Sequence, residues 1–178
     1  RTLTCDVGIT FLGIDWSLAR AGDIHLSQER FTKELLEKHG MAACKPSKSI
    51  AMDKPPEQDD VPTASELTAL QAFAGEFNWL ATRTRPDMAY FTSLLASSAS
   101  KQRRWSQELA HKVLRYLAGT ADQALVMSAT GSTDDLWVHS DAGFAGADTK
   151  SQNGLVISLG GSIITWRSSR AALSALST

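Results

Sequence analysis

The chain has 178 residues, of which 43% are hydrophobic and 21% charged, and its formal net charge at pH 7 is −1. This is the composition of a globular protein with enough apolar side chains for a core, in one domain or two small ones. The overall charge does not indicate a nucleic-acid partner, and no apolar run approaches the ~20 residues that cross a bilayer. The two cysteines and four histidines have no metal-ligand spacing, so the sequence predicts no zinc site.

The first part of the chain predicts a β-hairpin followed by a helix. Residues 7–17 (VGITFLGIDWS) alternate like a half-buried strand, and residues 22–27 (GDIHLS) form its expected partner. Ser27 is placed to cap a helix over residues 28–39, which Gly40 ends.

Residues 45–62 hold four of the five prolines and little apolar periodicity, so we expect a linker there. Three helices should follow and pack on one another. Thr63 and Glu66 form a T-x-x-E capping box for a helix that runs to about Ala81. Pro86 fits the first turn of the second helix, and the third covers residues 105–118 and ends at Gly119.

After Thr120 the apolar period changes from helical to strand-like. Residues 124–128 and 136–141 predict strands, and residues 154–168 predict a hairpin whose tight turn is Gly160-Gly161. Asp141 closes the second of these strands just before Ala142. From the residues alone, such an Asp is either a turn-capping side chain or a metal ligand.

Local charge differs from the overall charge between Arg83 and Arg115. This stretch contains seven basic residues against two acidic ones, Asp87 and Glu108. One interpretation is a solvated helix face. The other is a strip that faces the phosphates of a nucleic acid. The seven basic residues are Arg83, Arg85, Lys101, Arg103, Arg104, Lys112 and Arg115.

Seven sequence runs, in this order, resemble the pol polyprotein of copia-type retrotransposons. They are FLGIDW, IHLSQERFTKELLEKHGM, CKPS, TRTRPDMAY, VLRYLAGT, HSDAGFAGADTKSQNG and LGGSIITWRSS. The resemblance implies an α+β fold in four parts. Residues 1–44 would end the reverse transcriptase palm and thumb, with a β-hairpin and a helix, and residues 45–62 would be a linker. Residues 63–120 would be a three-helix connection segment, and residues 121–178 the first three strands of a ribonuclease H-like mixed sheet, truncated at the C-terminus.

The resemblance gives Asp141 a catalytic role as a magnesium ligand. Ribonuclease H enzymes cleave the RNA strand of an RNA–DNA hybrid with two Mg²⁺ ions held by carboxylates. Asp141 stands at the family's first such carboxylate. The sequence departs from the family pattern at Gly143 and Phe144, where the family has Asp and Trp, and we expect Asp148 to be a turn residue.

The resemblance also places the remaining carboxylates outside the chain. The polymerase aspartates would lie before Arg1, and the next ribonuclease H carboxylates after Thr178, so we expect this piece alone to cleave nothing. The expected partners are the rest of the polyprotein and an RNA–DNA hybrid or primer–template, with no membrane. The expected location is the cytoplasm, within virus-like particles, or the nucleus. The phosphate contacts we predict are Arg83, Arg85, Arg103 and Arg104; for Arg85, pairing with Asp87 is the alternative.

Two functional hypotheses follow. The chain is a fragment of a reverse transcriptase and ribonuclease H polyprotein, or it is a non-catalytic retroelement relic with weak, sequence-independent nucleic-acid binding or none. An intact Tyr-x-Asp-Asp box upstream and an Ala-Glu-Ala-Glu stretch downstream, in the same frame, would favour the first hypothesis.

Overall fold

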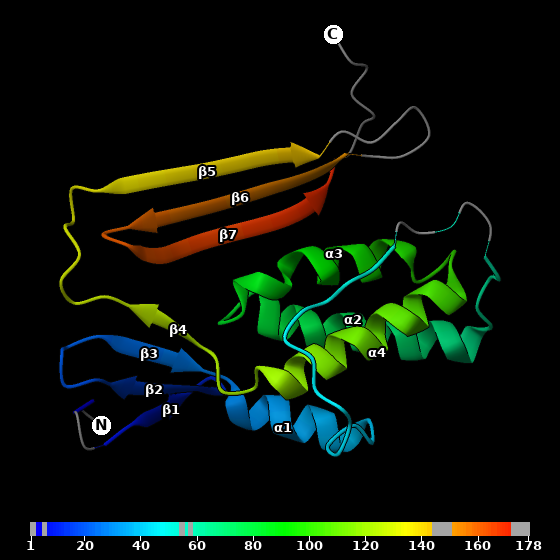
Figure 1. Cartoon of the computed structure of the whole chain (residues 1–178), viewed down its shortest axis with the longest axis horizontal. Coiled ribbons are helices and arrows are strands. Elements are labelled where there is room, and N and C mark those ends of the chain that lie inside the picture. Colours follow the sequence, from blue (N-terminus) through cyan, green and yellow to red (C-terminus); the bar gives the residue numbers. More distant parts are fainter. Residues whose placement is uncertain (1–2, 5–6, 54–55, 57–58, 144–150, 172–178) are drawn as a thin grey trace, which may run out of the picture. The chain divides into compact units, whose positions relative to one another are not determined.

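A computed structural model describes residues 3–4, 7–53, 56, 59–143 and 151–171. The chain forms two compact units. The helical unit comprises residues 27–124, and the β unit comprises residues 1–26 and 125–178. Helices and two separate sheets make this an α+β protein, as the sequence predicts (Figure 1).

The helical unit contains four α-helices and one short 3-10 helix among the described residues. They are α1 (Glu29–Lys38), α2 (Ala64–Ala81), η1 (Pro86–Met88), α3 (Ala89–Ser98) and α4 (Arg103–Gly119). The apolar stripes predicted from helical spacing meet in one core, which confirms the three helices expected after residue 62. Its most buried side chains include Leu70, Phe77, Leu80, Met88, Leu95, Leu109, Val113, Leu114 and Leu117.

The helices begin in two different ways. Thr63 and Glu66 form the predicted capping box, in which the Glu66 carboxylate accepts from Thr63 N at 2.9 Å and Thr63 Oγ1 accepts from Glu66 N. α4 has no cap from its own Gln102. Instead, the Asp59 carboxylate accepts from Trp105 N at 2.9 Å, so a residue far back in the sequence satisfies this helix end.

Residues 45–62 connect α1 to α2 as expected, and their described part also packs along α4. Ser47 N donates to Arg115 O at 2.9 Å, and Arg103 N donates to Asp60 O at 2.9 Å. A Cβ atom on Gly119 would lie 2.2 Å from Ser47 O, so only glycine allows this close approach. The segment therefore belongs to the helical unit.

The first sheet has the order β1-β2-β3-β4, formed by Ile9–Phe11, Ile14–Leu18, Ile24–Ser27 and Ala124–Met127. The prediction of one strand over residues 7–17 is wrong. Leu12 and Gly13 have φ angles of 50° and 72°, and they form a turn that pairs Phe11 with Ile14. Two successive residues with positive φ suit a tight hairpin turn. The sequence did not reveal this turn because apolar residues lie on both sides of it. β4 also joins this sheet rather than the C-terminal one.

The second sheet has the order β5-β6-β7, from Leu136–Gly143, Gln152–Leu159 and Ser162–Arg170. Its strands lie where the sequence predicts the last three strands. Gly160 and Gly161 have φ angles of 55° and 79°, as the predicted tight turn requires. Both strand pairs are antiparallel, so the described part of the sheet is not mixed.

Strand β5 exposes a run of large apolar side chains. Leu136, Trp137 and Val138 are 61%, 61% and 58% exposed, and within the described residues β5 pairs with β6 alone. An apolar edge strand of this kind is a template for pairing with other chains.

Val138→Lys should therefore reduce self-association on heating, because charge at an edge opposes intermolecular strand pairing. The free energy of unfolding should change by only about 0.5 kcal/mol, as is usual at exposed sites. Light scattering during thermal unfolding measures the effect. Thr133→Lys adds the same charge in an exposed turn outside β5 and is the control. Equal scattering by both variants would argue against β5 as the associating surface.

Candidate nucleic-acid interface

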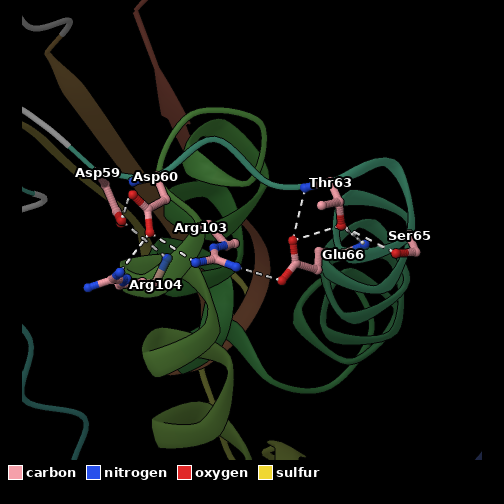
Figure 2. A network of polar contacts seen from close by, with 7 residues as sticks. All are labelled: Asp59, Asp60, Thr63, Ser65, Glu66, Arg103 and Arg104. Carbon is pink, nitrogen blue, oxygen red and sulfur yellow. Dashed lines mark hydrogen bonds and ion pairs between the residues drawn. The ribbon is translucent and has the colours of Figure 1, made fainter.

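Two of the predicted phosphate contacts, Arg103 and Arg104, lie in the first turn of α4 and are paired with carboxylates (Figure 2). Arg103 Nη1 lies 2.9 Å from Glu66 Oε1, and its Nη2 lies 2.9 Å from Asp60 Oδ2. Arg104 Nη2 lies 2.9 Å from the same Asp60 oxygen. Asp60 thus bridges both guanidinium groups.

Two carboxylates of this cluster, Glu66 and Asp59, have a lowered pKa and stay ionised at neutral pH. Hydrogen bonds from the Thr63 backbone and hydroxyl, and then from Arg103, lower the pKa of Glu66 to about 2. The backbone N–H of Trp105 is the main cause of the lowered pKa of Asp59. Three carboxylates therefore surround two arginines. The basic strip seen in the sequence is neutralised here by residues distant in the chain.

Next to this cluster lies an open cleft of about 380 Å³. Its charged lining is Asp59, Asp60, Glu108 and Arg104, so carboxylates outnumber cations. A phosphate group entering it would meet repulsion before it reached Arg104.

Arg85 is a core residue, with only 3% of its surface exposed. Its guanidinium donates to Asp87 at 2.8–3.2 Å, to Thr120 O at 3.0 Å and to Thr120 Oγ1 at 2.8 Å. Its Cζ lies 5.4 Å from the centre of the Tyr116 ring. Burial opposes the ionisation of Asp87, but the hydrogen bonds from Arg85 and Tyr116, together with the charge of Arg85, outweigh burial, and the pKa of Asp87 is lowered. The alternative of pairing with Asp87 is the one observed, and the buried guanidinium joins η1 to the end of α4 rather than facing a phosphate.

Arg83 is exposed at the end of α2. Its guanidinium lies 4.8 Å from the centre of the Trp79 ring, a cation–π arrangement. Within the described residues it forms no ion pair. Of the four predicted contacts, Arg83 alone combines exposure with an unpaired charge.

Asp141 lies within β5, opposite Gly154 and two residues before the strand ends at Gly143. Its side chain is exposed. No three His, Cys, Asp or Glu side chains come together as a metal site in the part of the chain that the structure describes. One carboxylate does not hold Mg²⁺ against water, so the described residues do not form a magnesium site. Phe144 and Asp148 lie outside the described residues.

The helical unit also contains a basic pocket that the sequence did not predict. Lys112 and Arg115 on α4 line it together with Ser47, Ser49 and Ala51. The i, i+3 spacing of the two cations on α4 was visible in the sequence. The opposite wall of the pocket was not visible in the sequence, because it comes from the segment expected to be a linker.

No family model and no solved structure matches the chain. It is 33% identical to the retrovirus-related Pol polyprotein from transposon RE2 of Arabidopsis thaliana over 165 residues, which are 90% of this chain and 11% of that protein. It is 29% identical to the putative transposon Ty5-1 protein YCL074W of Saccharomyces cerevisiae, over 90% of this chain and 53% of that protein. It is 33% identical to secreted RxLR effector protein 161 of Plasmopara viticola, over 58% of this chain and 74% of that protein.

The expected resemblance to transposon polyproteins is therefore confirmed over most of the chain. The chain is similar to retrotransposon Pol polyproteins over most of its length, and it spans about a tenth of the length of the Arabidopsis polyprotein. None of the described helices is long and apolar enough to cross a membrane.

The structural role of Arg85 can be tested by comparing the same substitution at Arg85 and at the exposed Arg83. Removing one partner of a buried ion pair costs about 3–5 kcal/mol. The Asp87 side chain is 33% exposed, so we expect Arg85→Met to lower the free energy of unfolding by about 2–4 kcal/mol. Arg83→Met should lower it by less than about 1 kcal/mol. Urea unfolding followed by circular dichroism compares the two variants, and equal losses would contradict this assignment.

Proposed function

We propose that this chain is the part of a retrotransposon polyprotein that follows the polymerase catalytic residues and continues into a ribonuclease H domain. In the whole protein these activities copy RNA into DNA and cleave the RNA strand of the hybrid. The observation that carries the proposal is the similarity to transposon Pol polyproteins over 90% of the chain. On this proposal, residues 1–44 belong to the palm and thumb, and residues 121–178 to the ribonuclease H part.

We assign to the helical unit the task of holding an RNA–DNA hybrid or primer–template by its backbone. A polymerase needs affinity without sequence preference, and phosphate contacts supply it. The exposed Arg83 beside Trp79 supports this assignment, because an aromatic ring and a guanidinium together suit a nucleic-acid surface. Arg104, whose side chain is 75% exposed, can also reach a phosphate.

The pairing with Asp60 weakens this contact without abolishing it. Exposed ion pairs are typically worth only about 0–1 kcal/mol. A charge-assisted hydrogen bond from Arg103 or Arg104 to a phosphate can therefore replace the bond to Asp60, provided that the remaining carboxylates are screened.

The alternative, a non-catalytic module with nucleic-acid affinity alone, is supported by the short relatives. The chain spans 53% of the Ty5-1 protein and 74% of the RxLR effector protein. The sequence on either side of this chain, in the same reading frame, discriminates between the two proposals, because only a working polyprotein needs both carboxylate sets.

Binding of a labelled RNA–DNA hybrid should be sensitive to salt and indifferent to base sequence. Arg83→Ala and Arg104→Ala should each reduce the slope of log affinity against log salt by slightly less than about one unit per lost phosphate contact. Fluorescence anisotropy over a salt series measures both quantities. Lys33→Ala, which removes a cation from α1, is the control. Absence of binding even at low salt would refute the proposed function.

We propose further that Asp141 serves a metal site completed by carboxylates outside the described residues. In the intact polyprotein, Asp141→Asn should then abolish cleavage of the RNA strand and leave DNA synthesis largely unchanged. Asn keeps the side-chain shape but removes the negative charge that helps to hold Mg²⁺. Cleavage and extension assays on a labelled hybrid measure both activities, and full cleavage by the mutant would leave Asp141 as an exposed residue of β5 without a role in metal binding.

A further inference from the structure

A small basic pocket lies between α4 and the segment that packs along it. Its volume is about 220 Å³, and its lining is Ser47, Ser49, Ala51, Lys112 and Arg115. It thus contains two cations and two hydroxyl-bearing residues, and no carboxylate is among the described residues that line it. The cleft at the other end of α4 has the opposite character, with three carboxylates and one arginine.

Arg115 is held in place before any ligand arrives. Its Nε donates to Lys45 O at 2.9 Å, and its own carbonyl accepts from Ser47 N at 2.9 Å. Within the described residues its two terminal nitrogens, Nη1 and Nη2, have no partner. An anchored guanidinium loses little side-chain freedom on binding, and its free edge matches two oxygens of a phosphate.

Lys112 has only a weak competing partner. Its Nζ lies 2.8 Å from Glu108 Oε1, one turn back on α4, and the two side chains are 35% and 59% exposed. Exposed pairs of this spacing contribute only about 0.3–0.5 kcal/mol. A phosphate oxygen can therefore replace the Glu108 carboxylate at small cost.

The far wall of the pocket is polar. Ser47 Oγ donates to Ser49 O at 2.7 Å, which shapes the turn. The Ser49 hydroxyl has no partner within the described residues and is a possible donor to an anion. Gly119 lets this wall approach the helix. The negative end of the α4 dipole acts within its last turn, just beyond the pocket, so it weakens anion binding only slightly.

We propose that this pocket binds a phosphate group. Its volume is below the ~300–1,000 Å³ typical of pockets for drug-sized ligands, which favours a small anion over a whole nucleotide. Resting on the proposed function, the anion is a backbone phosphate of the bound nucleic acid. The main phosphate contact of α4 then lies at Lys112 and Arg115, about 14–18 Å along the helix from Arg103 at about 1.5 Å per residue.

The test places a charge in the pocket without removing any hydrogen bond. Ala51 lines the pocket, and Ala51→Glu introduces a carboxylate there, whereas Ala51→Gln adds the same bulk without charge. Hybrid affinity at low salt should fall about tenfold for Ala51→Glu and remain nearly unchanged for Ala51→Gln. Lys112→Gln with Arg115→Gln should reduce the salt slope by slightly less than about one unit per lost contact. Arg103→Gln with Arg104→Gln should reduce it less.

A second arm uses inorganic phosphate alone. Heteronuclear NMR titration of the full chain should show shifts at Ser47, Ser49 and Arg115 that Ala51→Glu abolishes. Circular dichroism confirms that each variant is folded. If Arg115→Gln impairs folding, the Ala51 pair still decides the question.

The outcomes separate the two proposals. Hybrid binding that is insensitive to Ala51→Glu and to the Lys112–Arg115 pair overturns the pocket and leaves the proposed function intact. Phosphate binding without hybrid binding supports the pocket as a site for free phosphate and refutes the proposed function. Absence of phosphate shifts at millimolar concentration, together with unchanged hybrid affinity in the variants, excludes the pocket for either source.

Discussion

The packing of residues 45–62 along α4 is the interaction on which most features of the helical unit depend. The segment supplies the Asp59 carboxylate that caps α4, and Asp60, which pairs with its first two arginines. Near the other end of the helix, Ser47 N donates to Arg115 O, and the Arg115 side chain donates to Lys45 O. A stretch that connects two helices thus also determines how α4 starts, how its charge is offset and what shape its basic pocket has.

The helices were predictable because their signals are local. The apolar stripe and the Thr63–Glu66 box act within a few residues, and the core forms where these signals place it. The prediction of a single first strand was also wrong for a local reason. The turn at Leu12-Gly13 interrupts a run that is apolar on both sides, and alternation alone does not reveal where such a run folds back.

The candidate interface was less predictable because charge acts through space. Counting residues between Arg83 and Arg115 ignores Asp60 and Glu66, which lie 43 and 37 residues from Arg103 in the sequence. By contrast, the pairing of Arg85 with Asp87 was visible as an alternative, since the two are near neighbours in the sequence. The basic pocket is formed between α4 and residues 47–51, and the sequence indicated only the cations on α4. The similarity to transposon Pol polyproteins adds what neither charge nor fold supplies, namely the kind of longer protein to which the chain is related.

Asp60 accepts from Arg103 and Arg104 through the same oxygen, Oδ2. The two guanidinium groups are therefore not independent, because any event that turns this carboxylate away releases Arg104 and leaves Arg103 paired with Glu66 alone. An approaching polyanion meets paired arginines until Asp60 moves, and it then meets Arg104 unpaired and Arg103 with one partner fewer. Engagement at this end of α4 is expected to be cooperative, so that the surface discriminates between brief electrostatic encounters and a ligand that stays long enough to displace the carboxylate.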